Sequence, residues 1–287
     1  MFLNIAWYFF IYAFLGWCVE VVYAAVISGK FVNRGFLNGP FCPIYGLGML
    51  LVLHLLGPVK NNIFLMFFGA VIIASAVELT AGFLLEKLFH KRWWDYSELR
   101  FNLGGYISLK FSLQWGLACI IVLDRIHPPI IALVNWIPLT LSQVLLLFLA
   151  VLLLIDLIST VNSILKLSRK LETIDEISLR IKEASDSIGE NLASGAIALA
   201  QKKDDLGERF EEQREIIEAD LAEMRIAQQK ALAHRKQALQ ELRQANRELL
   251  EATFFGYKRL LRAFPDLKSK DHKDALEQLK KVKQEAE

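Results

Sequence analysis

The sequence predicts an all-α membrane protein, a polytopic bundle of about five transmembrane helices followed by a long cytoplasmic helical or coiled-coil tail. Three observations predict this fold class. Hydrophobic residues make up 54% of the 287 positions, and the mean hydropathy is +0.34. The apolar residues are concentrated before Lys166, whereas the long charged runs follow it. Because soluble domains rarely reach such values, the lipid bilayer is the expected surrounding of the first part.

The change in composition also predicts the domain organisation. We expect a transmembrane domain over residues 1–162, a cytoplasmic helical or coiled-coil segment over 163–253 and an amphipathic C-terminal segment over 254–287.

Four apolar stretches are long enough to cross a bilayer, which takes about 20 residues of helix. They are Phe2–Ile27, Ile63–Leu85, Tyr106–Leu123 and Leu139–Val161. The first has no basic residue before it and exceeds the core of a signal peptide, so we expect it to remain uncleaved. A fifth stretch, Pro43–Leu56, is short and follows a Gly/Pro-rich approach. It either crosses the bilayer or dips in and returns.

The distribution of Lys and Arg favours five crossings, because cytoplasmic flanks are enriched in these residues. With five crossings, one side receives Lys30, Arg34, Lys87, Lys91, Arg92, Arg100, Lys166, Arg169 and Lys170, and the other side only Lys60 and Arg125. This places the N-terminus outside and the tail in the cytoplasm.

Charged residues inside a membrane are costly and therefore candidates for function. The candidate intramembrane polar site comprises Glu20, Glu78, Lys110, Gln114 and Asp156. At about 1.5 Å of rise per residue, all lie in the cytoplasmic half of the bilayer. We expect Glu20 and Glu78 to share a site with Lys110. One interpretation of this group is a path for a substrate, ion or proton. The alternatives are a polar knot that only fixes helix register, and snorkelling of Lys110 or Asp156.

Two loops carry further candidates. Gly and Pro bend the backbone before the short apolar stretch, and non-helical backbone at membrane depth must be buried in protein or line water. The candidate gate is Arg34, Asn38, Gly39, Pro40 and Pro43. An ordinary tight connector is the alternative. In the loop Lys87–Gly105, we expect Trp93, Trp94 and Tyr96 to act as interface anchors in the headgroup region.

Both loops also carry a family resemblance. The motif-bearing segments are Arg34–Gly46, Glu86–Phe89, Trp93–Ser97, Phe101–Ile107 and Trp115–Gly116. In these segments, and over about residues 3–160, the chain resembles the bacterial family of "putative type IV ABC-transporter permeases", also called CmpB-like. The resemblance implies a multi-pass protein of the bacterial cytoplasmic membrane. It indicates a class and no substrate, and it does not extend over the tail.

The sequence argues against several classes of function. A net charge of +2 gives no basic field for nucleic acid. Cys18, Cys42 and Cys119 form no metal-binding or disulfide pattern, so we expect no metal and no cofactor. The chain has no phosphate-binding loop of the GxxxxGK[ST] type, so ATP-driven transport needs a separate ATP-binding subunit. No Ser or Cys has a base in a recognisable pattern, and we expect no enzyme.

The tail is dominated by good helix formers without proline up to about Ala252. Its heptad-like apolar pattern predicts a segmented coiled coil or hairpin with a hinge around Gly189–Gly207. The aromatic cluster after Thr253 either packs on a neighbouring helix or binds the membrane surface. We therefore expect the tail to mediate homo-oligomerisation or partner binding.

Two functions remain. The first is a permease-like membrane subunit of a transporter. The second is a non-transporting membrane scaffold or sensor whose coiled-coil tail binds a partner.

Overall fold

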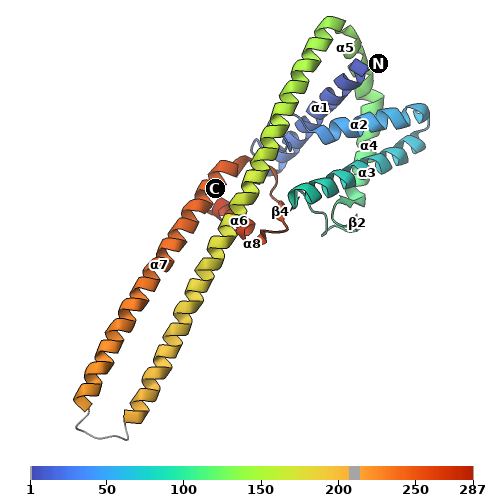
Figure 1. Ribbon diagram of the computed structural model, residues 1–287. Coiled ribbons are helices and arrows are strands. Elements are labelled where there is room, and N and C mark those ends of the chain that lie inside the picture. Colours follow the sequence, from blue (N-terminus) through green and yellow to red (C-terminus); the bar gives the residue numbers. More distant parts are fainter. Residues whose placement is uncertain (1, 207–213, 287) are drawn as a thin grey trace. The chain divides into compact units, whose positions relative to one another are not determined.

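The computed structural model describes residues 2–206 and 214–286, and most of them are helical (Figure 1). Four helical segments are long and apolar enough to cross a membrane. They are α1 (Phe2–Ser28), α3 (Ile63–Phe89), the rod Leu109–Trp136 and the apolar start of α6 (Leu139–Leu206). A shorter apolar helix comprises α2 (Pro43–Leu56) and η1 (Gly57–Val59). The predicted all-α membrane bundle is confirmed, and a full crossing by the short helix stays a prediction.

Local sequence fixes the ends of α3. The side chain of Asn62 accepts hydrogen bonds of 3.1 Å from the backbone N–H groups of Phe64 and Leu65, so it caps the first turn. The helix ends at His90, whose φ of 53° is left-handed. It thus continues past the expected end at Leu85, and Glu86 lies within it.

The fourth span differs from the predicted Tyr106–Leu123. It begins at α4 (Leu109–Ile121), because β3 (Ile107–Ser108) pairs with β2 (Asn102–Leu103). It then continues through a π-helical turn, η2 (Val122–Ile126), into α5 (His127–Trp136). The prolines of α5 lie in its first turn, where a missing backbone N–H costs little. The rod therefore runs on beyond Leu123.

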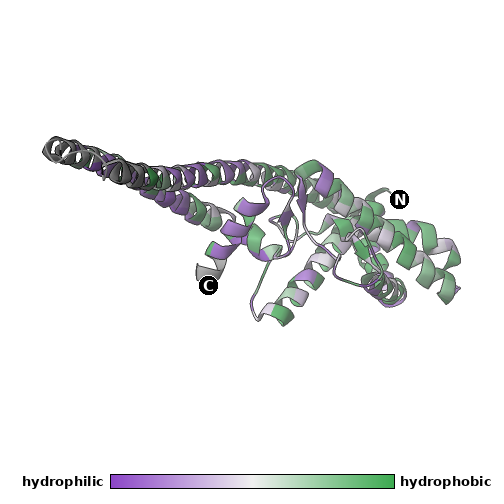
Figure 2. Ribbon diagram, turned by 90° about the horizontal axis from the view of Figure 1, so that it is seen from below, coloured by the Kyte–Doolittle hydropathy of each residue, from purple (hydrophilic) through white to green (hydrophobic). Residues whose placement is uncertain are grey.

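The apolar helices pack in sequence, α1 on α2, α2 on α3 and α3 on α4, while α5 returns to α1. One core cluster joins Tyr12 of α1 to Ile130 and Val134 of α5. A second joins α2, α3 and α4 around Val52 and Ala70. Many large apolar side chains of these helices remain exposed, as expected of helices surrounded by lipid. Figure 2 shows that hydrophobic residues dominate this part of the chain.

The chain forms two compact units. The first, which we call the membrane unit, comprises Met1–Ser168 and Tyr257–Lys273. The second comprises Arg169–Gly256 and Asp274–Glu287. We call Tyr257–Lys273 the docking segment. It starts where α7 (Arg214–Ala263) departs from helical geometry at Tyr257. Its β4 (Lys268–Ser269) pairs antiparallel with β1 (Lys91–Arg92) of the membrane unit.

The docking segment buries its apolar side chains. Leu261 is 2% exposed and Leu267 is fully buried, and the ring of Phe264 lies 6.1 Å from that of Trp93. Packing on a neighbouring helix and binding to the membrane surface were the two alternatives for the aromatic cluster. Over the docking segment, the side chains pack within the protein.

The second unit consists of α6 from Arg169, α7 up to Gly256 and α8 (Lys273–Ala286) from Asp274. Gln278 of α8 contacts both longer helices, because its side-chain amide hydrogen-bonds with Ser178 and Asn246. Helix α6 passes Gly189 without a break and continues to Leu206. The expected hinge is therefore absent from the described part of Gly189–Gly207, and Gly207 lies outside the described residues. Coiled-coil packing of the tail stays a prediction.

Candidate functional site

A polar site in the membrane unit begins at the close contact between α1 and α2. A Cβ atom on Gly16 would lie 2.2 Å from Cγ of Tyr45, so only glycine lets this ring approach α1. One turn further along α1, Glu20 Oε1 accepts a 2.6 Å hydrogen bond from the Tyr45 hydroxyl. Gly16 thus lets Tyr45 approach closely enough to bind Glu20.

The second carboxylate comes from α3. Glu78 Oε1 accepts a 3.1 Å hydrogen bond from the hydroxyl of Tyr96, whose ring stacks on Phe111 at 4.8 Å. Burial raises the pKa of the Tyr96 hydroxyl above its ordinary value. The charges of Glu78 and Glu20 raise this pKa further, whereas Arg34 lowers it. Tyr96 is therefore a neutral donor, and the charges of both glutamates act on it.

The cation of this site is Arg34. Its Nε lies 3.5 Å from Glu20 Oε2, and its guanidinium carbon lies 5.2 Å from the centre of the Tyr23 ring. Neither Arg34 Nε nor Glu78 Oε2 has a hydrogen-bond partner within the described residues, although both atoms are buried. Two carboxylates and one guanidinium leave a net negative charge, so the site can accept a proton or another cation. We call Glu20, Arg34, Tyr45, Glu78 and Tyr96 the carboxylate site.

The structure thus places Glu20 and Glu78 in one site, with Arg34 in the place where we expected Lys110. Lys110 and Gln114 lie on the exposed face of α4, opposite the buried Ser112 and Gly116. The expectation for Lys110 rested on its height in the bilayer alone. Height does not define the rotation of a helix about its axis, and the buried Ser112, Gly116 and Cys119 show that Lys110 faces away from the packed side of α4.

Asp156 belongs to a different group of residues. This group holds the Gly/Pro-rich segment over residues 35–43, which we call the Gly/Pro loop. Its carboxylate accepts hydrogen bonds from the backbone N–H of Gly39 at 2.7 Å and of Asn38 at 3.1 Å. The Asn38 amide also donates to it at 3.0 Å and to Thr160 at 2.9 Å. Asp156 therefore fixes the loop against α6.

The docking segment holds the same loop from its carbonyl groups. A guanidinium nitrogen of Arg259 donates to the backbone oxygens of Leu37 at 3.1 Å and Gly35 at 3.3 Å. Burial lowers the pKa of Arg259 below its ordinary value, and Asp156 opposes that shift. Sequence reasoning missed Arg259, because nothing in its neighbourhood indicates a contact more than 200 residues away.

The remaining residues of the candidate gate take ordinary positions. Pro40 is exposed, and Pro43 begins α2, where proline suits the first helical position. Of the five predicted residues, Arg34 belongs to the carboxylate site, while Asn38 and Gly39 contact Asp156.

The aromatic residues expected at the headgroups point into the protein. Trp93 is 3% exposed and packs against Phe36, Phe89 and Phe264. The indole N–H of Trp94 donates to the carbonyl of Tyr106 at 2.9 Å. Tyr96 reaches Glu78, as described above. Their placement differs from the expected interface anchors, because the loop folds onto the ends of the helices and buries its aromatic side.

A lysine beside Trp93 is also buried. Lys91 is 2% exposed, and its ammonium donates a hydrogen bond to the hydroxyl of Ser168. Burial lowers the pKa of Lys91 to about 8, while Asp271 opposes that shift. Nearby, Glu86 accepts from Arg92 at 2.8 Å and from Lys270 at 2.6 Å. These contacts tie the docking segment to the end of α3.

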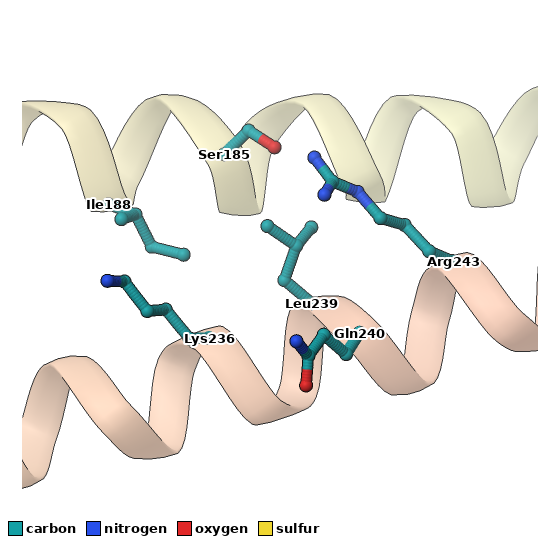
Figure 3. A pocket seen from close by; sticks show the side chains of 6 residues that line it. All are labelled: Ser185, Ile188, Lys236, Leu239, Gln240 and Arg243. Carbon is teal, nitrogen blue, oxygen red and sulfur yellow. The ribbon is translucent and has the colours of Figure 1, made fainter.

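Outside the membrane unit, a hollow lies between α6 and α7 (Figure 3). Ile188 and Leu239 point toward each other there, and the charged ends of Lys236 and Arg243 lie around them. Ser185 and Gln240 complete the lining, which contains no carboxylate, so its composition is that of a helix seam. Among the described residues, no group of three or more His, Cys, Asp or Glu side chains is placed to hold a metal ion.

Comparison with protein families identifies the membrane unit. A family described as "Putative ABC-transporter type IV" matches residues 7–161, which is more than half of the chain. The chain belongs to this family. Curated proteins and solved structures give no match. The family match covers both carboxylates, the Gly/Pro loop and Asp156, and it ends before the tail. By the description of its family, this membrane protein is a component of an ABC transporter.

Proposed function

We propose that the chain is the permease-like membrane subunit of a bacterial transporter, and that the carboxylate site lies on its path. The observation that carries this proposal is the pairing of Glu20 and Glu78 with neutral phenols and one loosely held arginine. A polar knot that only fixed helix register would satisfy its buried atoms, because buried polar groups in native proteins are nearly always hydrogen-bonded. Here one oxygen of Glu78 and Nε of Arg34 have no such partner within the described residues.

The proposed topology follows from the distribution of Lys and Arg. The protein crosses the cytoplasmic membrane several times, with the N-terminus outside and the tail in the cytoplasm. The carboxylate site then lies toward the cytoplasmic ends of α1 and α3. A separate ATP-binding subunit supplies the ATPase, since this chain has no phosphate-binding loop. We propose no enzymatic activity for the chain itself.

A scaffold or sensor is the second candidate, and one observation favours it. Helix α6 runs without interruption from its apolar start to Leu206. A continuous helix can transmit a displacement between a membrane and a partner that binds the tail. In this case the tail mediates oligomerisation or partner binding, and the carboxylate site is structural.

Purification of the tagged full-length chain from bacterial membranes in a mild detergent tests the class. We expect an ATPase with a phosphate-binding loop to co-purify in a fixed ratio, and its ATP hydrolysis to change when Glu20→Gln or Glu78→Gln is introduced. The matched control is Glu98→Gln, because Glu98 is exposed on the neighbouring loop. Absence of any ATPase after mild cross-linking contradicts the transporter and favours the scaffold.

Access to the site is tested by carbodiimide labelling of the protein in proteoliposomes, read by mass spectrometry. On a transport path, Glu20 and Glu78 react with the water-soluble reagent, and the labelling changes when the ATPase turns over. If only Glu98 reacts in every state, the site is closed to water and the path is refuted.

A further inference from the structure

A hollow lies on the surface of the membrane unit, where the loop before α4 meets the first turns of that helix. It has a volume of about 310 Å³, and its lining residues are Leu99, Arg100, Phe101, Leu109, Lys110 and Leu113. The lining combines two cations with four apolar side chains. This composition differs from that of the carboxylate site, and none of the contacts described so far involves it.

The two cations are available for a ligand. Among the described residues, neither Arg100 nor Lys110 forms an ion pair, and the nearest interaction of Lys110 is with the Phe111 ring at 5.8 Å. Both side chains are exposed, and so is Glu98, which pairs with neither of them. Two positive charges therefore face outward at the start of a membrane span, without a protein anion to balance them.

An apolar stripe leads from this hollow along α4. Residues at four-residue spacing lie on one face of a helix. On this face the exposed side chains are Leu109 at 47%, Leu113 at 41%, Leu117 at 57% and Ile121 at 51%. The buried side of α4 adjoins this stripe and packs against α3, where Gly116 meets Phe67 and Val71. The stripe is therefore the lipid-facing side of the span.

Phe101 completes the hollow on the side of the loop. Its ring is 80% exposed, although its backbone has a φ of 56°, which is rare for an aromatic residue. The turn is held by the hydrogen bond from the Leu109 N–H to the Phe101 carbonyl, at 3.0 Å. A large exposed aromatic next to two cations is typical of a surface that meets the headgroup layer.

We propose that this hollow binds one anionic phospholipid, with the phosphate between Arg100 and Lys110 and an acyl chain along the Leu109–Ile121 stripe. Charge complementarity favours an anionic headgroup, since basic pockets at membrane spans attract such lipids. The apolar lining favours a lipid over free phosphate, which would leave the four apolar side chains and the stripe without a partner. This proposal does not depend on the transport function.

Native mass spectrometry of the delipidated full-length protein tests the proposal. The probes are phosphatidylglycerol, phosphatidylcholine with the same acyl chains, and inorganic phosphate. The test variant is Arg100→Gln with Lys110→Gln. The control is Lys30→Gln with Lys87→Gln, which removes two exposed cations at the same end of the membrane unit. A third variant, Arg100→Lys with Lys110→Arg, keeps both charges and reports on folding.

We expect one tightly retained phosphatidylglycerol per chain and no equivalent retention of phosphatidylcholine. Loss of both cations weakens phosphatidylglycerol binding on the order of thirtyfold, because each basic residue near an anionic lipid surface contributes about fivefold. The control and the charge-preserving variant bind as the wild type does, and inorganic phosphate does not displace the lipid. Equal retention of the two lipids, wild-type binding by the test variant, or displacement by inorganic phosphate overturns the proposal.

Discussion

The hydroxyl of Tyr45 donates a 2.6 Å hydrogen bond to Glu20 across the interface between α1 and α2. The bond depends on Gly16, one turn before Glu20, because the Tyr45 ring occupies the space that a side chain there would need. A packing feature and a polar feature of the membrane unit thus share the same three residues.

Replacement of Gly16 by alanine is expected to destabilise the membrane unit. The new Cβ would lie 2.2 Å from Tyr45 Cγ, so the ring must move and the bond to Glu20 is lost. Overpacking of this kind costs about 1–3 kcal/mol. The measurement is thermal unfolding in detergent, followed by tryptophan fluorescence.

Gly57→Ala is the matched control for this prediction, because nothing lies within 4 Å of a Cβ built there. Its unfolding temperature should remain close to that of the wild type. An unchanged unfolding temperature for Gly16→Ala would contradict the close contact between α1 and α2.

Loss of the Asp156 carboxylate is expected to release the Gly/Pro loop. Asp156→Ala removes the acceptor of the backbone N–H groups of Asn38 and Gly39. Hydrogen bonds to a charged group contribute roughly 1.5–3 kcal/mol, so these amides should exchange at least about tenfold faster. Hydrogen–deuterium exchange of peptides that cover residues 35–42 measures this effect.

The control is Asp124→Ala, which removes an exposed carboxylate that pairs with the neighbouring Arg125 at 2.8 Å. Exchange in the loop should not respond to it. Equal exchange in the Asp156→Ala variant and the wild type would mean that Arg259 and local packing hold the loop without Asp156.

Much of the membrane unit could be predicted from the sequence, because long apolar runs leave a helix little choice of environment. The four long spans and the short helix follow from this constraint. Glu20 and Glu78 could also be brought together, since they lie at similar heights in parallel helices. The cation that pairs with them could not be predicted, because the height of a residue along a helix says nothing about rotation of the helix around its axis.

Contacts between segments far apart in the sequence could not be predicted either. Arg259 and the loop it holds are separated by more than 200 residues, and β1 pairs with β4 through two residues each. Such short pairings leave no periodic pattern in the sequence. The fourth span also continues past its predicted end at Leu123, because Asp124 and Arg125 lie within a π-helical turn that leads into α5.

Lys91 is expected to make stability depend on pH at the alkaline end. Burial lowers its pKa to about 8 in the folded protein, whereas an unfolded lysine has a pKa of about 10.4. Between these values the unfolded chain binds more protons, so stability rises with pH from about 8 to about 10.4. Below pH 8 the burial of the charge costs roughly 3 kcal/mol.

Lys91→Met should therefore raise the unfolding temperature at neutral pH and remove the rise between pH 8 and 10. Thermal unfolding at a series of pH values measures both effects. The control is Lys87→Met, because Lys87 is exposed and its replacement should leave the pH dependence intact. A steep alkaline rise that persists in Lys91→Met would assign the effect to another group.

Asp95 is expected to hold the docking segment down to acidic pH. Although burial acts to raise the pKa of Asp95, hydrogen bonds from Lys268 and from Ser97 lower it well below its usual range. Its contribution to stability is complete above the unfolded pKa of about 3.9 and is lost only as the pH falls through the lower folded value.

Asp95→Asn removes the charge at all pH values and should loosen the docking segment by about 1 kcal/mol, since Lys268 is largely exposed. Trypsin should then cleave the Asp95→Asn variant near Lys268 faster than the wild type at neutral pH. The control variant, Glu98→Gln, should be cleaved at the wild-type rate. Equal cleavage of all three proteins would show that β-pairing and the Phe264–Trp93 contact suffice for docking.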